Sequence, residues 1–193
     1  MRNKPILIVA GEPESIFFEI FFKSLKKIKI EKPIILFTSY KLLVLQMKKL
    51  DYKINIKILD NQKIKQYKLD NKSINIIDVD YSPNNVFDKI SKKSNKFITE
   101  TFNLAFKLIK KEKIKSFING PISKKSFLDS KYLGITEYIS DYFNKKKICM
   151  LIYNKELSVC PVTTHLPLKL VTKEINKNNI TQKVILINDF YKK

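Results

Sequence analysis

The sequence predicts an α/β protein built on a parallel sheet with helices on both faces. Short β-rich runs alternate with longer stretches of helical period, which is typical of parallel α/β sheets. Two of the three glycines, Gly11 and Gly120, come shortly after predicted strands, where turns toward helices are expected. The 193 residues, of which 44% are hydrophobic, can bury about 70% of the surface of the unfolded chain in a real core.

The first half of the chain contains four predicted strands and two helices. The strands are expected at 5–10, 33–38, 55–59 and 74–79, and the helices at 13–28 and 40–50. Helical spacing predicts that one apolar face of the first helix consists of Ile16, Phe17, Ile20, Phe21, Leu25 and Ile28. The Lys- and Asn-rich stretch 60–73 has no sustained helical face and is expected to be a loop or hairpin.

The second half continues the alternation and then changes in character. Ser94 is a candidate N-cap of a long helix through Ile109, and a strand is expected at 115–118. Further expected elements are short helices at 124–129 and 136–143, strands at 147–153 and 156–162, and closing helices at 166–174 and 181–191. We expect residues 1–140 to form the N-terminal part of a main α/β domain, and residues 141–193 to begin a second α/β domain with a β-hairpin.

The hairpin has a predicted register. A two-residue turn at Asn154 and Lys155 pairs positions whose numbers sum to 309, so Cys149 would face Cys160 directly. Because cytoplasmic thiols are kept reduced, we expect two buried free thiols and no disulfide.

The net positive charge suggests a nucleic-acid partner, but the type and distribution of the basic residues argue against one. The chain has 38 basic and 18 acidic residues, a net charge of +20, yet Arg2 is its one arginine and the lysines are spread over the whole length. Base-edge and bidentate phosphate recognition depend on the arginine fork, so a solvated surface is the favoured interpretation. No apolar run reaches the 18 residues that a membrane span needs, and no signal peptide is recognisable, which predicts a cytoplasmic protein.

Scarce residue types mark the candidate site. Average usage predicts about 13 glycines, whereas Gly11, Gly120 and Gly134 are all that occur. The one histidine, His165, lies in the run VTTHLPL at the end of a predicted strand. The alternatives are plain turn glycines and a structural, hydrogen-bonded histidine. One histidine cannot form a metal site alone, so metal binding requires ligands from elsewhere.

Four motifs carry a family resemblance. The run GEPESIFFEI at 11–20 resembles GDPAGIGPEI, the opening motif of the 4-hydroxythreonine-4-phosphate dehydrogenase family of pyridoxal phosphate (vitamin B6) biosynthesis. The runs NGPISK at 119–124 and GITEY at 134–138 are similar to the family's TGPINK and GHTEF. The run VTTHLPL at 162–168 matches the family motif almost residue for residue. The four occur in the family's order.

The resemblance implies a fold, a reaction and roles for three residues. The fold is the two-domain isocitrate and isopropylmalate dehydrogenase type, here C-terminally incomplete, in a homodimer with the site between domains. The reaction is NAD-dependent oxidation, with decarboxylation, of 4-phosphohydroxy-L-threonine, assisted by a divalent metal (Zn, Mg or Co) held by three histidines shared across the dimer. By position, His165 corresponds to a metal ligand, Thr136 to a substrate contact, and Ile135 to the family's substrate-binding histidine.

Two departures from the family leave alternatives open. Ile135 cannot donate a hydrogen bond, and the chain ends before the region that holds the family's other metal histidines and most NAD contacts. The leading hypothesis is therefore a family member, a fragment, or one part of a split enzyme completed by a C-terminal piece. The second is a catalytically inactive remnant or anion-binding module. The third is a basic nucleic-acid-associated domain.

Overall fold

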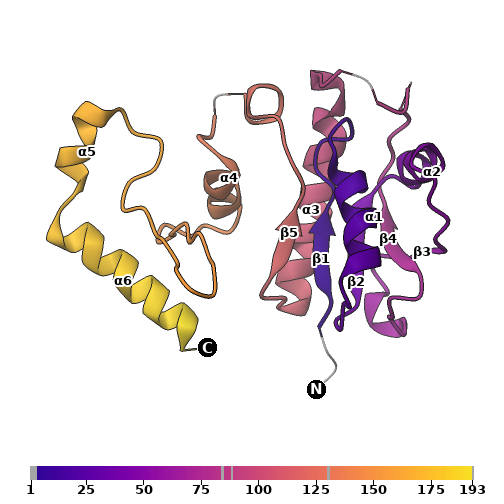
Figure 1. The fold of residues 1–193 in the computed structure, drawn as a ribbon, viewed down its shortest axis with the longest axis horizontal. Helices are drawn as coiled ribbons and strands as arrows, with labels where there is room; N and C mark the ends of the chain where they lie inside the picture. Colours follow the sequence, from indigo (N-terminus) through magenta and orange to yellow (C-terminus); the bar gives the residue numbers. More distant parts are fainter. Residues whose placement is uncertain (1–3, 84, 88, 130, 193) are drawn as a thin grey trace. The chain divides into compact units, whose positions relative to one another are not determined.

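A computed structural model describes residues 4–83, 85–87, 89–129 and 131–192. The chain divides into two compact units, Met1–Phe127 and Leu128–Lys193 (Figure 1). These compact units divide after Phe127, whereas the sequence pattern predicts a domain boundary near residue 140; the domain division itself stays a prediction. None of the described helices is long and apolar enough to cross a membrane.

The first unit is organised around a five-stranded parallel sheet of order β3-β4-β2-β1-β5. The strands are β1 Ile6–Val9, β2 Ile34–Thr38, β3 Ile56–Ile58, β4 Ile74–Asp78 and β5 Phe117–Asn119. This architecture confirms the α/β prediction. All five expected strands of this unit occur, and the last begins two residues later than the sequence indicates.

Helices cover both faces of the sheet, as predicted (Figure 1). Side chains alternate between the faces of a strand, and Ile8, Leu36 and Ile76 share one buried cluster with α1 Phe17–Lys27 and α2 Tyr40–Lys49. Helix α3, Asn95–Glu112, contacts β1 and β2. The central strands are therefore enclosed, and all five side chains of β2 are buried.

The predicted apolar face of α1 is only partly correct. The helix begins at Phe17 and not near Pro13, and it buries Phe17, Phe18, Phe21 and Phe22. Ile16, Ile20 and Ile28 of the expected face are exposed, at 61%, 51% and 59%. A rotation that buries four phenylalanines removes more apolar surface from water than one that buries isoleucines.

Ser94 precedes α3 but does not cap it with its side chain. The hydroxyl makes no bond to the first turn of the helix. It lies 2.7 Å from Glu12 Oε1 instead. A short 3₁₀ turn, η2 at Lys92–Ser94, leads into the helix, and another, η1 at Ile64–Gln66, lies in the expected loop after β3.

The second unit contains three α-helices, α4 Ile135–Tyr142, α5 Leu168–Glu174 and α6 Lys177–Tyr191. A single turn of π-helix, η3 Lys124–Leu128, stands where a short helix was expected and runs across the unit boundary. In the described part of this unit only Leu128 and Gly134 are buried.

The predicted β-hairpin is wrong in extent and register. Between 147 and 162 the described residues form one antiparallel bridge, Ile152 with Val159, so paired positions sum to 311. The Asn154 side chain accepts a hydrogen bond from the Glu156 N–H at 3.1 Å, and the Ser158 hydroxyl donates to the Asn154 carbonyl at 3.2 Å. These bonds stabilise a longer loop than a two-residue turn. Ile152 and Val159 are themselves at least half exposed, so little packing extends the pairing.

The two cysteines are free, and both are partly exposed. The new register makes Cys149 and Cys160 diagonal neighbours across the bridge and not a directly facing pair. The expectation of buried thiols is therefore wrong, because the segment that carries them packs loosely. Burial nevertheless raises the pKa of the Cys160 thiol, and the neighbouring Cys149 adds to the shift.

Candidate functional site

The loops that follow β1 and β5 pack against each other at the carboxyl edge of the sheet. The Gly120 N–H donates to the Val9 carbonyl at 2.7 Å, and the Glu12 N–H donates to the Pro121 carbonyl at 2.8 Å. A Cβ at Gly11 would lie 2.3 Å from the Pro121 oxygen, and Gly11 has a φ of +80°. The first glycine is thus required by contact between the two loops and by its own backbone conformation.

The same contact between the two loops also leaves no room for a side chain at Gly120. A Cβ there would lie 2.0 Å from the Ala10 carbonyl oxygen and 2.7 Å from the Phe17 ring. The two glycines therefore allow two family-like motifs, GEPESIFFEI and NGPISK, to meet backbone to backbone. In a sequence with so few glycines, the presence of Gly11 and Gly120 indicates that this contact between the two loops requires residues without a side chain.

Glu12, inside the opening motif, is buried in this region. It is 2% exposed, and Ser94, whose hydroxyl contacts its Oε1, is also 2% exposed. Burial raises the pKa of the Glu12 carboxyl, and the charge of Glu14 adds to the rise, while the Ser94 contact and the Glu14 N–H oppose it. Sequence reasoning assigned no role to Glu12 or to its contact with Ser94, because the two residues are far apart in the chain.

The second unit brings two of the family-like motifs together around Gly134. A Cβ at Gly134 would lie 3.0 Å from Glu137 Oε2 and 3.7 Å from His165 Nε2. The imidazole of VTTHLPL therefore lies beside the start of α4, which GITEY forms. Gly134 is the buried N-cap residue of α4 and leaves the space that these two side chains use.

Ile135 and Thr136 are the first two residues of α4 and are partly buried. The turn before the helix is fixed by Tyr132, whose hydroxyl donates to Asp141 at 2.6 Å and whose ring packs edge-on against Tyr138. The free N–H groups at a helix start favour an anionic ligand. Thr136 can add a hydroxyl there, whereas Ile135 adds only apolar surface.

His165 is not at the end of a strand, contrary to the prediction. The described residues 160–167 form bends and irregular backbone, and His165 itself has a φ of +58° and is exposed. Pro161 and Pro167 flank the segment and lack the N–H that a ladder needs. The ring thus reaches Gly134 from a loop.

Glu137 is a candidate functional residue that sequence reasoning did not assign. Its Oε2 atom is buried and has no hydrogen-bond partner among the described residues. A buried carboxylate oxygen without a partner costs free energy unless a ligand or water satisfies it. The signal was present in the sequence, since Glu137 is the acidic residue of GITEY.

The described residues do not fit a complete metal site. No three His, Cys, Asp or Glu side chains of the described ranges gather closely enough to hold an ion. His165 and Glu137 supply two groups of suitable type, fewer than the three or four protein ligands that zinc sites use. No step of a reaction is therefore derived through a metal here. Gly120 belongs to the other unit, so its predicted place in a shared site with His165 stays a prediction.

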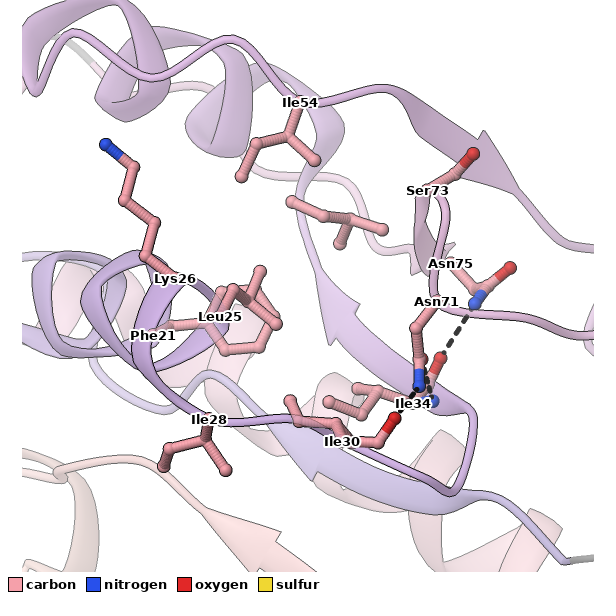
Figure 2. A pocket seen from close by; sticks show the side chains of 11 residues that line it. Phe21, Leu25, Lys26, Ile28, Ile30, Ile34, Ile54, Asn71, Ser73 and Asn75 are labelled. Atoms are coloured by element: carbon pink, nitrogen blue, oxygen red, sulfur yellow. Dashed lines mark hydrogen bonds between the residues drawn. The ribbon is translucent and has the colours of Figure 1, made fainter.

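A separate hollow of about 370 Å³ lies at the opposite, amino edge of the sheet. Figure 2 shows Phe21, Leu25, Ile28 and Ile54 around it, with Asn71 at one end. The Asn71 amide bonds only backbone groups, as the dashed lines in Figure 2 trace for Ile30 and Ile34. None of the residues that line the hollow belongs to the four motifs.

Comparison with known proteins decides the family. The family model described as pyridoxal phosphate biosynthetic protein PdxA matches residues 29–193, most of the chain. The chain belongs to the PdxA family. This confirms the predicted family, and three of the four motifs lie within the matched residues.

The PdxA relatives are longer than this chain. A 4-hydroxythreonine-4-phosphate dehydrogenase from Sulfurihydrogenibium sp. (strain YO3AOP1) is 32% identical over 97% of this chain, which spans 58% of that relative. The same enzyme name applies to a relative from Aquifex aeolicus (strain VF5), 29% identical over 96% of this chain and 57% of its own length.

Solved structures agree on the fold. The 4-hydroxythreonine-4-phosphate dehydrogenase from Klebsiella pneumoniae matches with a TM-score of 0.83 at 19% identity, covering 98% of this chain and 59% of that one. The dehydrogenase from Burkholderia phymatum matches with a TM-score of 0.77 at 20% identity, covering 93% and 56%. The chain thus has the α/β fold of PdxA structures over at least 93% of its length and corresponds to part of them.

Proposed function

We propose that this chain contributes the first part of a 4-hydroxythreonine-4-phosphate dehydrogenase, a cytoplasmic enzyme of pyridoxal phosphate biosynthesis. The proposed reaction is oxidation of the substrate hydroxyl with NAD as hydride acceptor, followed by loss of carbon dioxide. The observation that carries the proposal is the meeting of GITEY and VTTHLPL, in which His165 Nε2 lies beside Gly134. Membership of the PdxA family supports the dehydrogenase class.

Each residue around Gly134 has a proposed task. The N–H groups at the start of α4, together with the Thr136 hydroxyl, would hold an anionic group of the substrate. The unpartnered Glu137 Oε2 would accept a hydrogen bond from the ammonium group of an amino-acid substrate. His165 would give one ligand to a divalent metal whose remaining ligands lie outside this chain.

Ile135 changes how this site would recognise its substrate. An isoleucine offers no donor and no charge, so binding would depend on the backbone N–H groups and on Thr136. We therefore propose weaker binding of the substrate anion than in relatives with histidine at this position. Substitution Ile135→His should strengthen binding, and Ile135→Val, which keeps an apolar side chain, is the matched control.

The proposed assembly follows from the length of the relatives. A chain that spans 58% of a relative would need the remaining part, either as a complementing piece or within a homodimer of longer chains. We propose the division at residues 1–140 and 141–193 as the beginnings of the two domains of that enzyme. A catalytically inactive remnant remains the second candidate function, favoured by Ile135.

The decisive experiment is complementation. The purified chain is assayed for NADH formation with 4-phosphohydroxy-L-threonine, alone and mixed with the C-terminal 42% of the Sulfurihydrogenibium relative, the part outside the 58% match. We expect no turnover alone and measurable turnover in the mixture. His165→Ala should abolish that turnover, and Lys155→Ala, at an exposed position of the same unit, should not.

Two results would contradict the proposal. Turnover by the chain alone would show that the residues named here are insufficient to describe the site. No turnover in a mixture whose two pieces demonstrably associate would favour the inactive remnant.

A further inference from the structure

The side chains of Glu12 and Ser94 form a buried contact between two distant parts of the first unit. Glu12 belongs to the loop after β1, and Ser94 ends the turn that leads into α3. Their oxygens, Oε1 and Oγ, are 2.7 Å apart, and both residues are 2% exposed. At this separation one of the two oxygens carries the proton that joins them.

If Ser94 donates its proton to Glu12, it can no longer donate fully to the Ser91 carbonyl. Ser94 Oγ also lies 3.0 Å from the Ser91 carbonyl oxygen, which can only accept. A hydroxyl has a single proton, so Ser94 can donate to Glu12 or to Ser91 but not fully to both. If Glu12 is a neutral acid, it donates to Ser94, Ser94 donates to Ser91, and both contacts are complete hydrogen bonds.

The surrounding charges favour the same protonation state. Although the chain carries a net charge of +20, no ion pair of the described residues includes Glu12. The charged side chain that acts on it is Glu14, of the same sign and from the same loop. Burial is the main cause that raises the pKa of Glu12, and Glu12 Oε2 has no hydrogen-bond partner among the described residues. A buried, unpaired carboxylate beside another carboxylate is costly.

We propose that Glu12 keeps its proton at pH values at which an exposed glutamate is ionised, and donates it to Ser94 as a pH-sensitive latch between the loop after β1 and the start of α3. Loss of the proton leaves a buried negative charge facing Glu14. Ser94 must then divide its one proton between Glu12 and Ser91. The latch weakens, and the GEPESIFFEI loop loses its attachment to α3.

Titration of Glu12 in the folded chain tests the protonation state directly. Carbon-13 NMR of glutamate-labelled protein follows the Glu12 carboxyl, assigned by its absence in Glu12→Gln. We expect a midpoint above the usual 4.5. A midpoint at or below 4.5 would overturn the proposal.

Unfolding equilibria across pH provide the second test. A raised folded-state pKa means that stability is fully present below the unfolded pKa and is lost as pH rises toward the folded pKa. Within that window the ratio of the unfolding constants of the wild type and Glu12→Gln should rise by up to tenfold per pH unit. Glu31→Gln, an exposed control, should follow the wild type. Identical pH profiles for the wild type and Glu12→Gln would refute the latch. If Glu12→Gln does not fold, the NMR titration of the wild type is the deciding test.

Discussion

The Asn71 side chain fastens the start of β2 by accepting a hydrogen bond from the Ile34 N–H at 3.0 Å. Its amide nitrogen donates to the carbonyls of Ile30 and Lys32 at 3.1 and 2.9 Å. One side chain thus satisfies three backbone groups of the connection from α1 to β2, of which Figure 2 shows those of Ile30 and Ile34. We expect Asn71→Ala to lower the free energy of unfolding by about 2 kcal/mol.

Urea unfolding followed by circular dichroism measures this change. Asn55→Ala removes an equally large amide from an exposed position and should cost less than about 0.5 kcal/mol. Equal losses in the two variants would mean that the Asn71 hydrogen bonds contribute nothing measurable.

The second prediction concerns Gly11, where an added side chain would collide with the backbone of the loop after β5. Gly11→Ala places a Cβ 2.3 Å from the Pro121 oxygen and imposes a positive φ on alanine. We expect a loss of about 3 kcal/mol or more in unfolding free energy, measured by denaturant titration. Gly134→Ala is the control, since its φ of −164° suits any residue and its nearest neighbour is the flexible Glu137 side chain. A tolerated Gly11→Ala would show that the two loops separate at little cost.

The orientation of α1 predicts that truncating a buried phenylalanine costs much more stability than truncating a nearby exposed isoleucine. Phe22 is fully buried and Ile20 is 51% exposed. Phe22→Ala should therefore cost about 3–5 kcal/mol, and Ile20→Ala less than about 1 kcal/mol. Thermal and urea unfolding of the two variants give the comparison. A larger loss for Ile20→Ala would restore the helix face that sequence periodicity predicts.

The two thiols should differ in reactivity. Burial raises the pKa of Cys160, so less of the reactive thiolate is present at a given pH. We expect Cys160 in Cys149→Ser to react more slowly with iodoacetamide at neutral pH than Cys149 in Cys160→Ser, and to accelerate as pH rises. Mass spectrometry of timed samples measures both rates. Equal rates at every pH would show that Cys160 is as accessible as Cys149.

The strands of the first unit could be predicted because burial restricts their composition. Residues 33–38 are apolar except Thr38, and residues 74–79 are apolar except Asn75 and Asp78; β2 and β4 occupy these two segments almost residue for residue. The face of α1 could not be predicted by spacing alone, since Ile16, Ile20 and Ile28 fit an apolar stripe that excludes the buried Phe18 and Phe22. Packing against the sheet, and not periodicity, selects between the two faces.

The candidate site shows a similar division. Motif likeness selected His165 and the start of α4 as candidates, and the structure places His165 Nε2 beside Gly134. The strand expected before His165 does not occur, because its loop has few buried neighbours to support a ladder. The contact of Glu12 with Ser94 joins residues 82 positions apart, and no local pattern indicates such a pairing.

The second unit, with only Leu128 and Gly134 buried among its described residues, has a consequence for how the chain opens. Amide protons are protected from solvent exchange in proportion to the free energy of the opening that exposes them. The backbone of α6 has little packing to disrupt, so its amides should exchange through local fraying. The amides of β2, enclosed by helices on both sides, should exchange only when the first unit unfolds as a whole. One polypeptide would therefore display two separate exchange regimes, with the slow regime confined to the parallel sheet and its helices.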